Sequence, residues 1–200
     1  THLARLTATP ALSPGNPDCL ANLPARHPGI RGGIQCVADL FLKAGDLPLA
    51  AESLDVVLAV ECIFHFPSRQ AFLQEAQRVL RPGGRLVLSD FVPCRPLAIL
   101  LRAMRSLRGA PFSNKTYGPI DSSWDQRRYA NQSRRLGLEL SHDVDITVHT
   151  QPTYTVVREL YRAMGADRAV RDTARIEQLS RSGWMRYRIL TFRKPIAANP

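Results

Sequence analysis

Two short apolar segments, separated by a helix-like segment, constrain the fold of this chain more than any other feature. Residues 54–62 read LDVVLAVEC and residues 85–91 read RLVLSDF. Both have the length and the β-branched composition that are typical of strands buried on both faces. Between them, residues 68–80 begin with a serine cap and repeat apolar residues at helical spacing. Strand, helix and strand in this order predict a right-handed βαβ unit in a doubly wound α/β sheet.

The sequence Pro82-Gly83-Gly84 separates the predicted helix from the second strand. Glycine takes the left-handed backbone conformation at little cost, so we expect these residues to end the helix in a tight reversal. Ligands of doubly wound sheets bind beyond the carboxyl ends of the strands. The polar residues near those ends are therefore predicted to form a functional edge: Glu61, Cys62, His65, Ser89 and Asp90.

The rest of the chain predicts a lid and a carboxyl-terminal half of helices and strands. After the second strand the chain becomes irregular and rich in Pro, Gly and Arg around one short helical segment, which predicts an inserted lid. The last segment, WMRYRILTFRKP, alternates and predicts a final antiparallel strand. We expect a single domain over residues 1–200 with a degenerate amino-terminal portion, a core, a lid and a carboxyl-terminal half: residues 1–45, 46–91, 92–123 and 124–195.

The basic charge of the chain raises the question of a nucleic-acid partner. The formal net charge is +10, and 24 of the 27 basic residues are arginine. These arginines are scattered singly, without a dense basic run, so we interpret them as a solvated surface and expect no nucleic-acid partner. The sequence contains no apolar run of about 18 residues, so we expect no membrane span. The four cysteines lack metal-site spacing, which predicts reduced thiols, no metal site and a cytoplasmic protein.

An ordered set of short motifs lies within residues 46–91. Its elements are Asp46-Leu47-Pro48, Leu54-Asp55-Val56-Val57, Glu61 four residues before His65, and RVLRPGG before a strand that ends at Asp90. This set resembles the small-molecule branch of class I S-adenosylmethionine-dependent methyltransferases, such as the sterol, quinone, phosphoethanolamine and sugar methyltransferases. The resemblance implies a Rossmann-like sheet, S-adenosyl-L-methionine as the cofactor and methyl transfer to a small organic acceptor.

The resemblance also implies roles for individual residues. It implies that His65 removes a proton from the acceptor or orients it; packing between Phe64 and Phe66 is the alternative. The residues implied to bind the cofactor are Asp39, Asp46, Leu47, Glu61 and Cys62. For Asp46 and Glu61 a local role in a turn stays open. For Asp90 we favour a structural role over contact with the acceptor.

The resemblance weakens toward the amino terminus. None of the 12 glycines forms a G-x-G sequence, and the first strand and Gly-rich loop of the family are absent. We therefore expect a sheet that is incomplete at this end, and an isolated chain that binds S-adenosylmethionine weakly at most. Two interpretations follow. The chain is part of a longer methyltransferase, or it is a catalytically inactive remnant that acts as an interaction protein.

Overall fold

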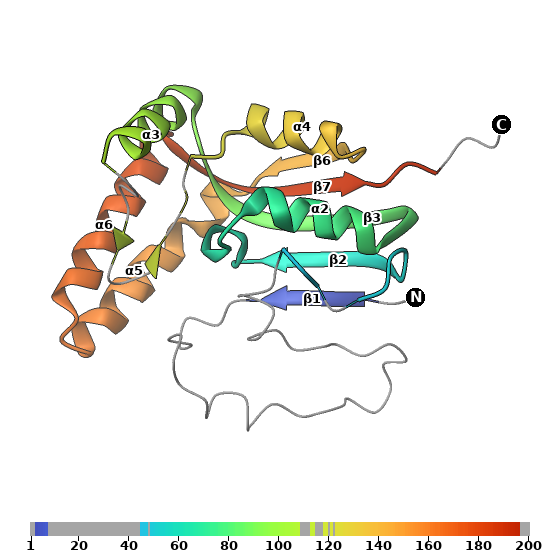
Figure 1. Ribbon diagram of the computed structural model, residues 1–200. Helices are drawn as coiled ribbons and strands as arrows, with labels where there is room; N and C mark the ends of the chain where they lie inside the picture. The colour runs from blue at the N-terminus through green and yellow to red at the C-terminus, as the bar shows by residue number, and fades with distance from the viewer. Residues whose placement is uncertain are drawn as a thin grey trace, which may run out of the picture. The chain divides into compact units, whose positions relative to one another are not determined.

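A computed structural model describes residues 3–7, 45–47, 49–108, 113–114, 118–119, 121 and 123–196 (Figure 1). Five strands form one sheet in the order β1-β2-β3-β7-β6: Leu3–Thr7, Leu54–Val60, Leu80–Pro93, Met185–Arg193 and Glu139–Asp145. Two further strands pair in an antiparallel ribbon, β4 at Ser113–Asn114 and β5 at Gly118–Pro119. The helical elements are η2, α2, α3, α4, α5 and α6: Ile63–His65, Arg69–Val79, Arg95–Arg108, Gln126–Arg135, Thr147–Ala163 and Asp167–Arg181.

The predicted βαβ unit is confirmed. Strands β2 and β3 are parallel neighbours, with Val57 opposite Leu86 and Ala59 opposite Leu88, and α2 connects them. On one face Val57, Ala59, Leu86 and Leu88 are almost fully buried. Residues of the other face, such as Leu58 and Val87, are only half-buried, so the predicted burial on both faces is met in part. On its other side β2 pairs in parallel with β1, a strand that the sequence analysis did not predict. The α/β, Rossmann-like fold class is thereby confirmed.

The final strand, β7, runs antiparallel to β3, as predicted. Near the start of β3 the Gly83 N–H donates to the Lys194 carbonyl and the Lys194 N–H donates to the Gly84 carbonyl. Just after the end of β3 the Cys94 N–H donates to the carbonyl of Trp184, which precedes β7. The start of one strand therefore faces the end of the other. In Figure 1 the arrow of β7 accordingly points opposite to those of β1 and β2.

Helix α2 begins where the sequence predicts and ends earlier. The Ser68 hydroxyl accepts the Ala71 N–H at 3.1 Å, which confirms the predicted cap. The helix ends at Val79 rather than at the Pro-Gly-Gly sequence, because Leu80 is already extended with ψ of 136°. Residues 81–84 then form an irregularity within β3, whose pairing with β2 shifts register at this point.

The two glycines of this irregularity are required for different reasons. Gly83 has φ of +83°, the left-handed conformation that was predicted. Gly84 is crowded instead, since a Cβ atom on it would lie 2.8 Å from the Arg81 carbonyl oxygen and 3.1 Å from that of Asp55. One glycine permits the backbone angle, and the other permits the close approach of two chain segments.

The chain divides into two compact units. The first contains residues 1–90, 130–142 and 190–200, and the second contains residues 91–129 and 143–189. Within the first unit α2 packs its apolar face onto the sheet through Phe72, Leu73, Ala76 and Val79 (Figure 1). Within the second unit α5 and α6 lie side by side, joined by a hydrogen bond from Gln151 to Ser180. The predicted single domain with a lid at residues 92–123 stays a prediction.

Helix α5 starts at Thr147 and contains Pro152. The reason is Asp145, whose carboxylate accepts hydrogen bonds from both the backbone N–H and the hydroxyl of Thr147. This side chain satisfies the first turn, so the helix forms ahead of the proline. Among the residues that the structure describes, no helix is long and apolar enough to span a membrane.

Candidate functional site

The loop at residues 61–68 leaves the carboxyl end of β2 and enters α2, at the edge where ligands of such sheets bind. Glu61 starts this loop in a left-handed conformation, with φ of 56°. Such a conformation costs a residue other than glycine about 1–2 kcal/mol. The N–H of Glu61 donates to the Ser89 hydroxyl at 3.1 Å, and the Glu61 side chain is exposed. The structure therefore presents a carboxylate at the end of the strand on a strained backbone.

A buried ion pair closes the other end of this loop. Arg69, the first residue of α2, places its Nη2 atom 3.1 Å from Oδ1 and 3.0 Å from Oδ2 of Asp90, near the end of β3. The two side chains are 1% and 0% exposed. Removing one partner from such a pair leaves an uncompensated charge in the interior, at a cost of roughly 3–5 kcal/mol. Asp90 therefore has the structural role that the sequence favoured, with an arginine side chain as its partner.

Cys62 lies within this buried edge. Its side chain has no solvent exposure, and burial raises the pKa of the thiol far above its ordinary value. The carboxylates of Asp90 and then Glu61 raise the thiol pKa further. The thiol is therefore neutral at physiological pH and has little nucleophilic character. The prediction that Cys62 binds the cofactor stays a prediction.

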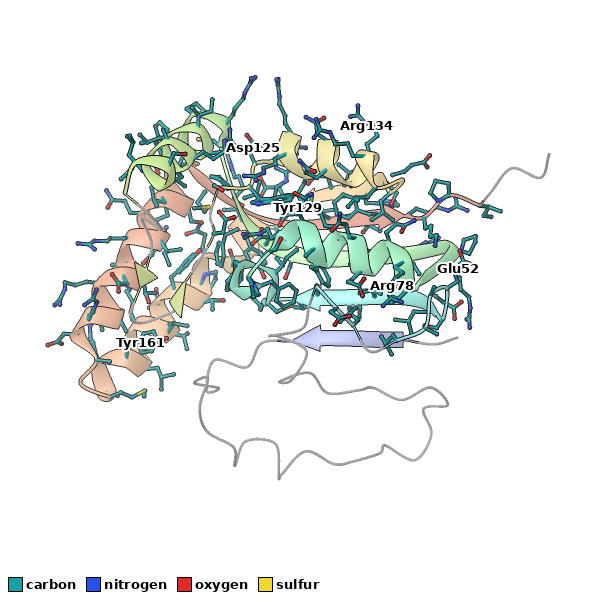
Figure 2. The ribbon with its side chains drawn as sticks, viewed as in Figure 1. Glu52, Arg78, Asp125, Tyr129, Arg134 and Tyr161 are labelled. Atoms are coloured by element: carbon teal, nitrogen blue, oxygen red, sulfur yellow. The ribbon has the colours of Figure 1, made fainter. Side chains whose placement is uncertain are left out.

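The segment with Asp46 and Leu47 is fixed to α2 by two side chains of that helix. The Leu47 N–H donates to Glu75 Oε2 at 2.9 Å, while the Arg78 guanidinium donates to the Leu47 carbonyl at 2.9 Å and to the Leu49 carbonyl at 2.7 Å. Figure 2 labels Arg78 near the segment that precedes β2. Arg78 also bonds Glu75. The hydrogen bond from Arg78 lowers the pKa of Glu75, burial opposes this shift, and the Leu47 N–H adds to it. The segment is thereby held in one backbone conformation.

The remaining predicted site residues lie as follows. Asp39 lies outside the described residues. Asp46 is exposed, Leu47 is 5% exposed, and His65 is the last residue of η2. Asp55, in strand β2, bonds Arg81 at 3.0 Å. The described residues contain no cluster of three or more His, Cys, Asp or Glu that could hold a metal ion.

Sequence reasoning missed Arg69 and Glu75 as determinants of this edge. Arg69 could have been found, because a cation in the first turn of a helix opposes the helix dipole and needs a compensating anion. The first turn of α2 contains no acidic residue, so the anion had to come from elsewhere in the fold. For Glu75 the sequence offers only the spacing of its ion pair with Arg78, three residues later, because its other partner is a backbone N–H that lies 28 residues away along the chain.

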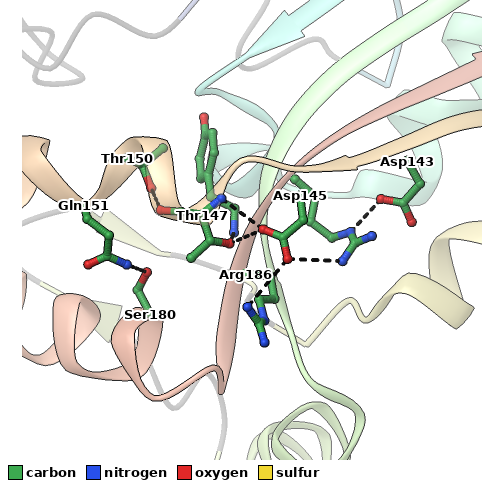
Figure 3. A network of polar contacts seen from close by, with 9 residues as sticks. Asp143, Asp145, Thr147, Thr150, Gln151, Ser180 and Arg186 are labelled. Atoms are coloured by element: carbon green, nitrogen blue, oxygen red, sulfur yellow. Dashed lines mark hydrogen bonds and ion pairs between the residues drawn. The ribbon is translucent and has the colours of Figure 1, made fainter.

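The second unit has a polar network of its own, at the junction of β6, α5 and β7 (Figure 3). Asp145 bonds Thr147 and lies 3.7 Å from Arg186 and 3.8 Å from Arg188. The Thr147 hydroxyl in turn accepts the Tyr187 N–H at 2.9 Å. The Thr147 bonds and the two arginines lower the pKa of Asp145 against the effect of burial. These contacts account for the local fold, and none of the predicted site residues takes part.

In a comparison with protein families, residues 25–88 match a family described as a methyltransferase domain. This chain is related to the class I methyltransferases. It is 32% identical over 124 residues to 27-O-demethylrifamycin SV methyltransferase of Amycolatopsis mediterranei, and 34% identical over 160 residues to phthiotriol/phenolphthiotriol dimycocerosates methyltransferase 1 of Mycobacterium ulcerans. The alignments cover 62% and 78% of this chain, but only 43% and 50% of those proteins. The chain thus spans half or less of the length of these relatives.

Solved structures show the same fold. A putative sarcosine dimethylglycine methyltransferase from Galdieria sulphuraria superposes with a TM-score of 0.60 at 14% identity, over 81% of this chain and 59% of that one. The cyclase SpnF superposes with a TM-score of 0.59 at 20% identity, over 84% and 57%. At such identities the likeness shows the fold alone, and a cyclase among these neighbours illustrates that this fold hosts more than one reaction.

Proposed function

We propose that this chain takes part in methyl transfer from S-adenosylmethionine to a small organic acceptor. One observation carries the proposal. The loop of residues 61–68, which begins with Glu61, lies at the carboxyl ends of two parallel strands within the region that is similar to methyltransferases. Two solved structures of similar fold, both of geranyl diphosphate methyltransferases, hold S-adenosylhomocysteine and S-adenosylmethionine, respectively. Their cofactors support the same class of ligand here.

The charges at this edge fit such a cofactor. S-adenosylmethionine carries a sulfonium and an ammonium group, both of which favour nearby carboxylates. Asp90 is buried in an ion pair with Arg69. Glu61 and Asp46 are exposed, so a ligand can reach them. We infer that Glu61 and Asp46 contact the cofactor, and that Asp39, Leu47 and Cys62 complete its site.

The chain's own residues would then orient the acceptor and manage its proton. When bound, S-adenosylmethionine supplies an activated methyl group. His65 is our candidate for the group that accepts a proton from the acceptor or fixes its orientation, because a histidine titrates near neutral pH. Its place at the end of η2, four residues after Glu61, puts it on the loop that follows the strand.

The charge of the chain supports a small-molecule partner over a nucleic acid. Ten arginines of the described residues lie within 4.0 Å of a carboxylate, which neutralises much of the basic charge locally: Arg69, Arg78, Arg81, Arg102, Arg158, Arg168, Arg175, Arg181, Arg186 and Arg188. The absence of a nucleic-acid partner, a cytoplasmic location and membership of a longer enzyme stay predictions.

Titration of S-adenosylmethionine into the 200-residue chain tests the proposal. Ligand-detected saturation-transfer NMR suits the weak binding that we expect. We expect saturable binding that S-adenosylhomocysteine displaces, that Glu61→Gln weakens, and that His65→Ala leaves unchanged. Absence of saturable binding by the wild-type chain would contradict the proposal and favour the alternative of an inactive interaction protein.

A further inference from the structure

Two consecutive residues of β3 hold both ends of the loop of residues 61–68. Ser89 accepts the N–H of Glu61, the first residue of the loop, at 3.1 Å. Asp90 binds Arg69, the residue that directly follows the loop, at 3.0 Å. Ser89 is 6% exposed and Asp90 is fully buried. The contact of Asp90 is thus shielded from water, where polar contacts are stronger than at a surface, and the contact of Ser89 is partly buried.

We propose that Ser89 and Asp90 are positioning residues that set the conformation of this loop and, through it, of Glu61 and His65. The inference rests on the proposed function, since it assigns the support of the same site. Consecutive side chains of a strand point to opposite faces of the sheet. Ser89 and Asp90 can therefore hold the two ends of the loop from different sides, which neither residue could do alone.

The strained backbone of Glu61 explains why the hydrogen bond to Ser89 is needed. A left-handed residue other than glycine persists only where its surroundings determine it. The Ser89 hydroxyl accepts the N–H of this very residue. Without that acceptor the backbone of Glu61 can relax toward the ordinary regions, and the carboxylate then changes its direction. The Ser89 hydroxyl therefore determines the direction of the Glu61 carboxylate.

The attachment of α2 to the sheet does not depend on these contacts alone. At the far end of the helix, the Lys194 ammonium donates to the carbonyl oxygens of Gln77 at 3.1 Å and Leu80 at 2.8 Å. Glu75 and Arg78 join the same helix to the segment before β2. The contacts of Ser89 and Asp90 instead lie near the amino-terminal end of α2. There they fix the backbone conformation of residues 61–68.

Amide hydrogen exchange on the ligand-free chain tests this inference independently of catalysis. Ser89→Ala removes one hydrogen bond, so we expect amides of residues 61–68 to exchange roughly 2- to 10-fold faster. Ser89→Thr keeps the hydroxyl and is expected to restore the wild-type rates. Ser141→Ala is the matched control, because the Ser141 hydroxyl bonds the Thr191 carbonyl at 3.1 Å on another strand pair. We expect it to leave the loop unchanged.

The outcomes separate this inference from the proposed function. Unchanged exchange of the loop in Ser89→Ala, or an equal rise throughout the chain, overturns the inference. Faster exchange confined to the loop, together with a weaker S-adenosylmethionine affinity that Ser89→Thr restores, supports it. An affinity that Ser89→Ala leaves unchanged overturns the assignment of Ser89 to the site. A wild-type chain that does not bind S-adenosylmethionine refutes the proposed function, and the exchange rates alone then decide whether the loop is held as inferred.

Discussion

The buried pair of Arg69 and Asp90 leads to a prediction about pH as well as stability. In Arg69→Met the Asp90 carboxylate loses its partner in a site without solvent exposure. The variant can escape this cost by protonating Asp90. For a carboxyl group with an ordinary pKa of about 3.9, protonation at pH 7 costs about 4 kcal/mol. We therefore expect Arg69→Met to lower the free energy of unfolding by about 3–4 kcal/mol at pH 7.

The sign of the pH dependence follows from the same argument. In this variant the folded chain binds a proton at Asp90 that the unfolded chain releases above pH 4. Stability relative to wild type therefore rises as the pH falls, by about 1.4 kcal/mol per pH unit. At pH 5 most of the loss should have disappeared. Asp90→Asn leaves a buried guanidinium, which stays charged at any pH of interest, so its destabilisation should not shrink in this way.

Urea denaturation of the wild-type chain and the variants at pH 7 and pH 5 measures both effects. Arg81→Met is the matched control: Arg81 bonds Asp55 at the same 3.0 Å, but the two side chains are 41% and 35% exposed. Exposed pairs contribute about 0–1 kcal/mol, so we expect little change. Equal losses in Arg69→Met and Arg81→Met, or a loss in Arg69→Met that is the same at both pH values, would refute the reasoning.

Two further predictions concern contacts outside the loop. Gly84→Ala should destabilise the chain more than Gly137→Ala. A Cβ on residue 84 would meet two backbone oxygens, whereas a Cβ on residue 137 would meet nothing within 4 Å and only the φ of +73° would be unfavourable. Equal denaturation midpoints of the two variants would contradict this expectation. The lowered pKa of Glu75 stabilises the folded chain above the ordinary carboxyl value of 4.5, and this contribution is lost as the pH falls through the lower folded pKa. Glu75→Gln should therefore cost about 1 kcal/mol at pH 7 and less as the pH falls below 4.5, as denaturation at pH 7 and at a series of lower pH values would reveal.

The parts of the fold that were predicted correctly depend on local signals. The strand runs around Val57 and Leu86, the cap at Ser68 and the left-handed Gly83 are each determined by residues close in sequence. Strand β1 was missed because five residues with little alternation, LARLT, become a strand only by pairing with β2, about 50 positions later. Periodicity carries no information about a partner at that distance.

The candidate site was predicted in part for a similar reason. Glu61 and His65 could be singled out because they follow a recognisable strand, and the structure has them on the loop at its end. The partners that fix this loop, Ser89 and Arg69, are chosen by tertiary structure and are 28 and 21 residues from the groups they bind. The sequence thus indicated residues suited to the chemistry and assigned Ser89 to the same edge, whereas the pairing of Ser89 with Glu61 and of Arg69 with Asp90 became apparent only in three dimensions.

The division into two units has a practical consequence for anyone who wishes to study them apart. Its boundaries fall inside β3, α4, β6 and β7, so the chain passes from one unit to the other in the middle of regular structure four times. No contiguous fragment contains either unit whole without residues of the other, and a fragment of residues 91–189 would cut both β3 and β7. Genetic dissection will therefore require circular permutation or grafted connections, and simple deletions that end near residue 90 will sever β3 next to Asp90.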